Sequence, residues 1–351
     1  MEKGINQRKT EHIRLCLTGN VEGVNKSTGL EGIHFIHNAL PEINFADITL
    51  ETSFLNKKLQ APFLVSSMTG GSELATTINQ NLALAAERNG WALAIGSTRA
   101  FLESDKHKES FLIREQAPTA PLIVNIGAVQ FNYGYGPEEC QRIIDKTGAD
   151  SIVLHLNSLQ EAVQDGGDLN FENLLPKIEQ VCKTLDAPVG VKEVGFGIDG
   201  VVAEKLYNAG ISYIDVAGAG GTSWSQVEKL RSRDPLKKAA AEAFNSWGNP
   251  TKDCIVSVRS NLPDAPLVAS GGMKTGVDAA KAITIGADII GYARQLLKAA
   301  TESEEAVKQT MDQIELELKM TMFGIGVKNL EELRNTNRVS VMGQSLMKEN
   351  S

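Results

Sequence analysis

The sequence lacks several features that mark common non-enzymatic classes of protein. No stretch of it approaches the roughly 20 apolar residues of a membrane span. The N-terminal segment MEKGINQRKTEHIR is polar and has no apolar core of the kind found in secretory signal peptides. Basic charge is not in excess either, since the formal net charge is −8, which disfavours a general nucleic-acid or anionic-membrane binder. Any anionic ligand must therefore meet a local cluster of basic residues.

Cysteine is also scarce, and its spacing excludes the usual cysteine-based sites. Cys16, Cys140, Cys182 and Cys254 lie far apart without a C-x-x-C pair, which favours free thiols in a reducing cytoplasm over disulfides or a zinc site. With 42% hydrophobic and 22% charged residues, the 351-residue chain can bury a large core. Its length is compatible with two domains or with one large barrel. We expect a soluble cytoplasmic protein with residues 1–351 in a single domain.

From Ala61 onward, short apolar runs alternate with helical patterns, which is typical of successive βα units and a parallel sheet. The strands are predicted at Pro62–Met68, Trp91–Gly96, Leu122–Ile126, Ser151–Asn157, Val189–Val194, Tyr213–Ala217, Leu267–Ser270 and Asp288–Tyr292. The helices are predicted at Thr76–Asn89, Glu109–Gln116, Pro137–Thr147, Phe171–Leu185, Gly200–Ala209, Thr251–Ser260, Gly276–Ile285 and Glu302–Met322. Eight such pairs predict an α/β fold of the (β/α)₈ TIM-barrel type, and an open doubly wound sheet is the alternative.

The barrel is expected to occupy residues 59–322, between an N-terminal extension and a C-terminal tail. The extension, residues 1–58, contains a segment that alternates like a strand at Ile48–Leu55. About thirty residues, Gly218 to Pro250, separate the sixth strand from its helix, and because long loops are usually functional we predict a lid or cofactor loop with a short helix around Pro235–Trp247. The tail, residues 323–351, should start a short helix at Asn329 with Glu332 three residues on, and then fray.

Polar residues follow the fourth predicted strand at the point where it ends. Side chains alternate along a strand, so Val153, His155 and Asn157 share one side, while Ile152, Leu154 and Leu156 share the other. Gln160 and Glu161 come directly afterwards. Catalytic groups collect at this end of the strands in a parallel barrel. The alternative is that His155 and Asn157 only satisfy buried backbone groups.

Two further features indicate a phosphate-bearing cofactor. Lys192 lies in an otherwise apolar run, and burying an ammonium group without a partner is costly, so it predicts an anionic or electron-rich ligand or else a salt bridge to Glu193 or another carboxylate. The seventh and eighth strands end in Ser270-Gly271-Gly272-Met273 and Gly291-Tyr292-Ala293-Arg294, at the usual phosphate site of this barrel. Together with a polar rim at Thr69, Ser97 and Asn125, these residues suit a flavin better than a sugar phosphate.

A second anion would need its own cations, for which Arg8, Lys9 and Arg99 are the candidates. Arg8 and Lys9 could also belong to an ordinary solvated terminus. Glu161 could contact Mg²⁺, because this ion is often held by one or two carboxylates while water and substrate phosphates complete its shell.

The motifs together resemble the type 2 isopentenyl-diphosphate isomerases, which are FMN-dependent (β/α)₈ barrels. The resemblance covers nearly the whole chain and rests on Arg8-Lys9-x-x-His12, Ser67-Met68-Thr69-Gly70-Gly71, Gly96-Ser97-Thr98-Arg99, Asn125-x-Gly127-Ala128, His155-x-Asn157-x-x-Gln160-Glu161, Lys192-Glu193-Val194-Gly195, Gly218-x-Gly220-Gly221-Thr222, Ser270-Gly271-Gly272 and Ala293-Arg294. Two positions depart from the family pattern: Thr98 stands where methionine or glutamine is more frequent, and Ser67 where some relatives have threonine.

The resemblance implies specific roles for these residues. FMN would be held by Ser67, Met68, Thr69, Ser97, Asn125, Lys192, Thr222, Gly271, Gly272, Met273, Ala293 and Arg294. Isopentenyl diphosphate would meet Arg8, Lys9, His12, Ser97, Thr98, Arg99 and Gln160, with His155, Asn157, Gln160 and Lys192 as the catalytic set and Glu161 at Mg²⁺. It further implies NADPH as the reductant and a homo-oligomer, a tetramer or octamer.

The implied reaction moves a double bond by one carbon to give dimethylallyl diphosphate, with reduced FMN as the acid and base. The strand-end motifs contain no evident carboxylate pair or catalytic cysteine that could do this instead. A flavin oxidoreductase is a competing hypothesis. However, Ser270-Gly271-Gly272-Met273 replaces the His and Arg of hydroxy-acid oxidases, and residues 218–250 lack the cysteine of nucleotide dehydrogenases. A non-catalytic FMN- or phosphate-binding barrel is the remaining alternative.

Overall fold

Eight parallel strands close into a barrel, which confirms the predicted fold and excludes the open sheet. The computed structural model describes residues 2–104 and 106–341, and the side chains of residues 8–104 and 106–340. The barrel order is β4, β5, β6, β7, β8, β9, β10 and β11, with β11 pairing back to β4. These strands are Phe63–Val65, Ala92–Ser97, Leu122–Gly127, Ser151–His155, Val189–Lys192, Tyr213–Asp215, Leu267–Ala269 and Ile289–Tyr292. Each lies where the sequence predicts it.

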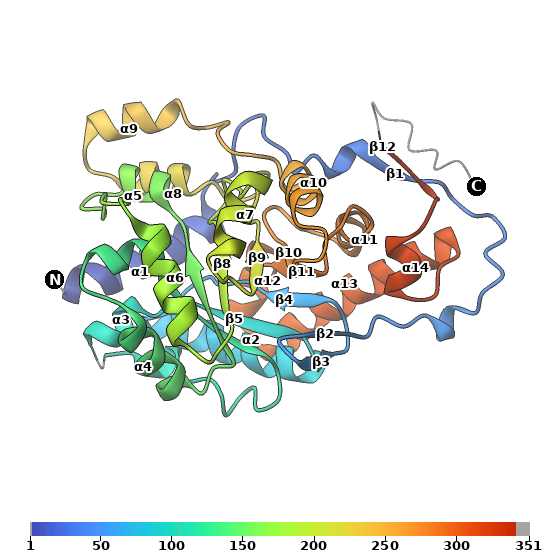
Figure 1. Cartoon of the computed structure of the whole chain (residues 1–351), viewed down its shortest axis with the longest axis horizontal. Helices are drawn as coiled ribbons and strands as arrows, with labels where there is room; N and C mark the ends of the chain where they lie inside the picture. The colour runs from blue at the N-terminus through green and yellow to red at the C-terminus, as the bar shows by residue number, and fades with distance from the viewer. Residues whose placement is uncertain (1, 105, 342–351) are drawn as a thin grey trace.

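Helices surround the barrel, and seven of the eight expected ones are confirmed (Figure 1). They are α2 (Glu73–Asn89), α4 (Pro137–Thr147), α6 (Leu174–Thr184), α7 (Gly200–Asn208), α10 (Thr251–Asn261), α11 (Gly276–Thr284) and α13 (Glu304–Ile325). Side-chain caps start several of them; the Ser72 hydroxyl, for example, accepts from the Ala75 N–H at the beginning of α2. An additional helix, α12 (Arg294–Glu302), follows β11 directly.

The helix predicted at Glu109–Gln116 is wrong. A short helix, α3 (Arg99–Glu103), and a 3₁₀ turn, η3 (Lys108–Ser110), occupy this part of the chain instead. Tertiary contacts override the local helical pattern here. The Ser110 hydroxyl accepts from the Gly71 N–H, and the Phe111 ring lies so close to Gly70 that a Cβ there would be 2.2 Å from it. The segment is therefore a loop that covers the chain following β4.

Two apolar layers hold the barrel together. Inside it, Leu64, Val153, Tyr213 and Val268 belong to one buried cluster, whereas Ile152, with the other outward-facing residues, packs in a larger cluster between sheet and helices. This confirms the alternation expected for β7. The end of the barrel opposite the carboxyl ends of its strands is closed by a hairpin of β2 (Thr52–Phe54) and β3 (Lys57–Leu59). The strand expected at Ile48–Leu55 is therefore shorter than predicted.

Different parts of the N-terminal extension lie at opposite ends of the molecule. Helix α1 (Glu2–Thr18), which the sequence analysis did not predict, packs against α8 and α12. After two 3₁₀ turns, η1 (Leu30–Gly32) and η2 (Phe45–Asp47), the chain enters the hairpin. Between those turns β1 (Ile33–Phe35) pairs antiparallel with β12 (Val339–Val341), far from α1 (Figure 1). The tail helix is confirmed as α14 (Leu330–Arg334) with Asn329 as its N-cap, while residues 342–351, predicted to fray, lie outside the described residues.

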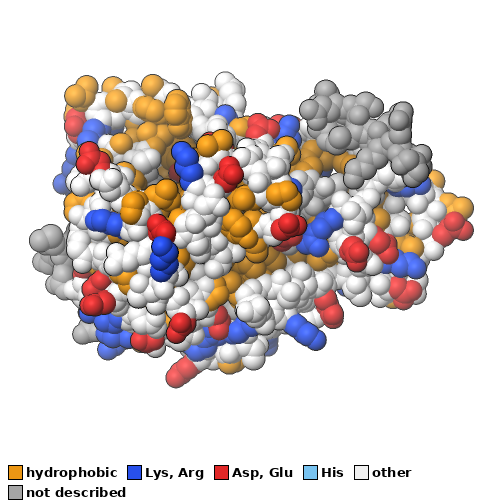
Figure 2. Space-filling model, in the orientation of Figure 1, with side chains coloured by type: hydrophobic (Ala, Val, Ile, Leu, Met, Phe, Trp, Pro, Cys, Tyr) orange, Lys and Arg blue, Asp and Glu red, His pale blue; other side chains and the backbone are white. Residues whose placement is uncertain are grey.

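The loop after β9 contains two helices, α8 (Trp224–Arg231) and α9 (Pro235–Glu242), of which only α9 was expected. These helices lie beside α1 and the short helix α5 (Ser158–Val163) (Figure 1). The outer surface here is apolar, with the side chains of Leu236 and Trp247 77% and 59% exposed, and hydrophobic groups gather over α9 in Figure 2. None of the helices in the described ranges is long and apolar enough to cross a membrane.

Candidate active site

The floor of the site is formed by one inward-facing position from each barrel strand. Two residues beyond the apolar inner layer, alternation places the next inward residue of each strand at the carboxyl end of the barrel. These eight positions are Ser66, Ser97, Asn125, His155, Lys192, Asp215, Ser270 and Gly291, where a register shift between Ala94 and Ser97 in β5 brings Ser97 level with Asn125. A Cβ on Gly291 would lie 2.4 Å from the Ser66 hydroxyl, so a larger residue does not fit there. The floor is therefore polar and closely packed.

A cavity of about 440 Å³ lies above this floor, within the size range of ligand pockets. Its lining brings together segments from α1, the strand ends and the loop after β9. The predicted site residues that line it are Arg8, Lys9, His12, Ser67, Met68, Thr69, Ser97, Arg99, Asn125, His155, Asn157, Gln160, Glu161, Lys192, Thr222, Gly271, Gly272, Met273, Ala293 and Arg294.

Thr98 is the exception among the predicted site residues. Its side chain is fully buried, and its hydroxyl donates to the Asn125 carbonyl oxygen at 2.7 Å. Ser97 lines the cavity, and its neighbour Thr98 turns into the protein behind the cavity wall. The Thr98 side chain therefore does not line the cavity, and a substrate contact at this residue stays a prediction.

His155 contacts a side chain of the site rather than a backbone group. Its Nδ1 lies 2.7 Å from Asn125 Oδ1, and Asn125 Nδ2 donates to the Ser67 hydroxyl at 3.1 Å. Burial, with the positive charges of Lys192 and Lys9, lowers the pKa of His155 to about 3. The imidazole is thus neutral at physiological pH, and the chain of three side chains fixes its orientation.

Lys192 and Glu193 do not form the salt bridge that the sequence left open. The Lys192 ammonium donates to the main-chain oxygen of Glu193. The Glu193 carboxylate turns away into the following loop, where the backbone N–H groups of residues 194 to 197 all donate to its Oε2. Burial lowers the pKa of Lys192, an effect that Asp215 and Glu193 oppose. Because Lys192 also lines the cavity, its amino group is available to a ligand at the cavity floor.

Glu161 is buried and held by three donors. Its carboxylate accepts from Asn157 Nδ2 at 2.8 Å, Gln164 Nε2 at 3.0 Å and the Asp168 N–H at 2.8 Å. Burial raises the pKa of Glu161. Among the residues that the structure describes, no three His, Cys, Asp or Glu side chains lie close enough together to hold a metal ion. A metal at Glu161 would therefore need ligands from water and substrate.

The basic residues of α1 face the cavity and are not part of an ordinary solvated terminus. Burial lowers the pKa of Lys9 to about 8, with a further contribution from the neighbouring Arg8, and burial also lowers the pKa of Arg8. Arg99 reaches the same cavity from α3, where it pairs with Glu103 at 2.7 Å and with Asp168 at 2.6 Å. Three cations thus converge on one side of the cavity.

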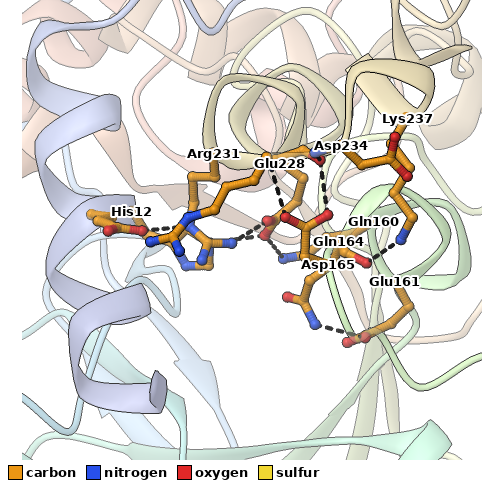
Figure 3. Close-up of polar contacts among 12 residues, drawn as sticks. His12, Gln160, Glu161, Gln164, Asp165, Glu228, Arg231, Asp234 and Lys237 are labelled. Atoms are coloured by element: carbon orange, nitrogen blue, oxygen red, sulfur yellow. Dashed lines mark hydrogen bonds and ion pairs between the residues drawn. The ribbon is translucent and has the colours of Figure 1, made fainter. Parts of the chain in front are cut away.

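The sequence analysis missed a network that links α1 to α5 and α8 (Figure 3). His12 Nε2 lies 2.8 Å from Glu228 Oε1, and Gln160 Nε2 donates to the same oxygen at 3.2 Å. Arg231 holds the other oxygen of Glu228 and also pairs with Glu11. Burial would raise the pKa of Glu228, but the hydrogen bond to His12 and the charge of Arg231 lower it overall. Glu228 is therefore an ionised, fully buried link between the predicted substrate residues.

Comparison with known proteins identifies the family of this site. A family model described as FMN-dependent dehydrogenase matches residues 161–340. The isopentenyl-diphosphate delta-isomerase of Oceanobacillus iheyensis is 86% identical over 347 residues, which cover 99% of both chains. Proteins of the same name from Rickettsia africae and a Nostoc species are 50% and 48% identical, and the alignments cover 93% and 94% of this chain and 95% and 94% of theirs.

Solved structures with low sequence identity share the fold. A flavocytochrome b2 variant superposes with a TM-score of 0.69 at 17% identity, covering 95% of this chain and 83% of that one. A mandelate oxidase variant gives a TM-score of 0.62 at 16% identity, covering 97% and 96%. These likenesses support the barrel architecture, and the close relatives support the activity class. The chain belongs to the family described as FMN-dependent dehydrogenase and to the isopentenyl-diphosphate delta-isomerases, so it is an isomerase.

Proposed function

We propose that the protein converts isopentenyl diphosphate to dimethylallyl diphosphate by a 1,3-allylic double-bond shift, using reduced FMN as acid and base together with Mg²⁺. One observation carries the proposal: a single cavity joins a polar, closely packed barrel floor to three cations and a buried carboxylate. The floor suits a flat heteroaromatic ring. The cations suit a diphosphate.

The floor and its rim fit FMN. The buried hydroxyls of Ser66 and Thr69 make no hydrogen bond within the described part of the chain, so a ligand at this rim would satisfy them. Gly271 has a φ of 99°, and a Cβ on it would lie 2.1 Å from the Gly218 carbonyl oxygen, which favours glycine where backbone must approach a phosphate closely. FMN would be held by Ser67, Met68, Thr69, Ser97, Asn125, Lys192, Thr222, Gly271, Gly272, Met273, Ala293 and Arg294. Once reduced, the flavin would supply the proton chemistry of the reaction.

The substrate diphosphate would lie opposite the floor, against Arg8, Lys9 and Arg99. Guanidinium groups bind phosphate oxygens through two parallel hydrogen bonds, and the ammonium group adds a compact charge. To bind a phosphate in this arrangement, Arg99 would release one of its carboxylate partners, Glu103 or Asp168. His12, Ser97 and Gln160 would complete the substrate contacts, and Glu228 holds His12 and Gln160 in position.

Mg²⁺ would bind at Glu161. Asn157 Oδ1 is buried and makes no hydrogen bond within the described residues, so it offers an acceptor oxygen near this carboxylate. The arrangement agrees with the preference of Mg²⁺ for few protein ligands plus water and phosphate oxygens. With His155 neutral, the imidazole can donate or accept a hydrogen bond to orient the substrate but brings no charge of its own.

The decisive test is an anaerobic incubation with isopentenyl diphosphate, FMN and Mg²⁺, with and without NADPH or dithionite, followed by NMR. Dimethylallyl diphosphate formed only with a reductant, and without net consumption of it, is the expected result. If a fully reduced, flavin-loaded protein formed no product, the proposal would be refuted, and an oxidoreductase or a binding protein would be favoured. Parallel assays with Glu161→Gln should lose the stimulation by Mg²⁺. We further propose NADPH as the reductant, a cytoplasmic location and a homo-oligomer, either a tetramer or an octamer.

A further inference from the structure

The barrel floor contains a second charged residue beside Lys192. Lys192 ends β8 and Asp215 ends β9, and the two are directly paired in the register of these neighbouring parallel strands. Alternation places both side chains inside the barrel, where they are only 8% and 3% exposed. Apart from His155, whose pKa burial lowers to about 3, these two are the only titratable side chains among the eight floor positions, all of which lie within the described chain. Burial lowers the pKa of Lys192 and raises that of Asp215, and the charge of each group opposes the shift of the other.

Each of the two charged groups has its own anchor. The Lys192 ammonium donates to the Glu193 main-chain oxygen. Asp215 Oδ1 accepts from the Ser270 hydroxyl at 2.6 Å and from the Ala217 N–H at 3.2 Å. Lys192 lines the cavity and Asp215 lies behind it, so the lysine would meet a ligand and the aspartate would act through the lysine.

The electrostatic consequence follows from the low polarity of this position. Opposite charges in a buried environment interact more strongly than in water. A reduced flavin carries more electron density than an oxidised one, so an unbalanced ammonium beneath it would favour the reduced form. A carboxylate next to that ammonium offsets part of this preference. The strength of the effect therefore depends on Asp215 as well as on Lys192.

We propose that Asp215 is a positioning residue that balances the charge of Lys192 and thereby limits how strongly the floor favours reduced over oxidised flavin. The inference rests on the proposed FMN site. It adds a residue, Asp215, that would not contact the cofactor but would change the electrostatic effect of Lys192 on it.

The test compares flavin affinities in the wild-type protein and in Asp215→Asn. Asparagine keeps the shape and an acceptor for Ser270 but removes the negative charge. We expect the ratio of the oxidised-FMN to the reduced-FMN dissociation constant to rise at least tenfold. This corresponds to a positive shift of about 30 mV in the two-electron midpoint potential. Tyr213→Phe is the matched control, because it removes a hydroxyl from the layer below without changing charge, and should leave the ratio unchanged.

A second measurement needs no flavin. In the apoprotein, Asp215→Asn leaves a buried ammonium without its counter-charge, whereas Asp215→Asn combined with Lys192→Met removes both charges. The double variant should therefore melt at a higher temperature than the Asp215→Asn single variant. If the Asp215→Asn single variant could not be recovered as folded protein but the double variant could, that result would also support the proposal.

The outcomes separate the inference from the proposed function. An unchanged affinity ratio, or a double variant that melts no higher than the Asp215→Asn single variant, would overturn the role of Asp215. Neither measurement uses isopentenyl diphosphate, so a failure of isomerase activity does not affect them. A wild-type protein that bound no FMN would overturn both proposals.

Discussion

Protonation of His155 should make the stability of the folded protein depend on pH. Burial lowers the pKa of this imidazole from 6.5 to about 3 in the folded state. Below pH 6.5 the unfolded chain therefore binds a proton that the folded protein does not. Because the unfolded state binds more protons, the free energy of unfolding falls as the pH falls from 6.5 toward 3.

The size of this effect follows from the two pKa values. Each unit of separation corresponds to about 1.4 kcal/mol, and at pH 5.0 about one and a half units lie between the pH and the unfolded value. His155 should then cost about 2 kcal/mol of stability at pH 5.0 relative to pH 7.5. Any folded pKa below about 4 gives nearly the same result, so the estimate depends on the burial of the ring rather than on the folded value.

The assay is urea unfolding of the apoprotein at both pH values, for the wild type and for His155→Gln. The variant cannot bind a proton at this position, so its loss of stability between pH 7.5 and 5.0 should be smaller than that of the wild type by about 2 kcal/mol. His12, whose pKa burial also lowers, remains in both proteins and cancels in the comparison. Parallel losses in the two proteins would refute the interpretation of His155 as a buried neutral base.

Three further substitutions test other parts of the structure. Glu228→Gln removes the charge that holds α1 to α8 and should weaken local protection by about 2 kcal/mol, so that amide exchange in α1 becomes roughly thirtyfold faster while barrel amides keep their rates. Gly96→Ala places a Cβ 2.5 Å from the Thr69 carbonyl oxygen and should weaken FMN binding at least tenfold in equilibrium dialysis, with an unchanged far-ultraviolet spectrum. Asp150→Ala breaks two ion pairs and a bond to the Leu122 N–H at the opposite end of the barrel, so urea unfolding should show a loss of about 2–3 kcal/mol with unchanged FMN affinity.

The barrel itself could be predicted because each strand combines apolar composition with turn residues at its ends. The elements that the sequence analysis missed depend on partners distant in sequence. Helix α1 carries Arg8 and Lys9 toward a cavity, and among its described side chains, residues 8–18, few are buried, such as that of Ile13, so its apolar pattern is weak. The pairing of β1 with β12 joins segments some three hundred residues apart, a partnership that no local signal indicates.

The candidate site divides in the same way. Strand alternation was enough to place His155 and Lys192 at the cavity, and it would also have identified Asp215, which lies two residues after the inward-facing Tyr213. Alternation fails at Thr98, because a register shift in β5 between Ala94 and Ser97 puts Ser97 at the cavity and turns Thr98 away from it. Glu228 could not have been found by this rule. Its position depends on how a helix inside a long loop packs against α1 and α5.

The same alternation explains why the proposed chemistry and the stability of the barrel can coexist on the same strands. The inner apolar layer, which includes Val153 and Tyr213, fills the barrel beneath the floor and is closed from below by Phe54, whose ring packs edge-on against Tyr213 at 5.2 Å. The polar floor therefore rests on a complete core rather than interrupting one. Buried groups such as Lys192 lie in the last layer before the cavity, where a bound ligand can share the cost of removing them from water.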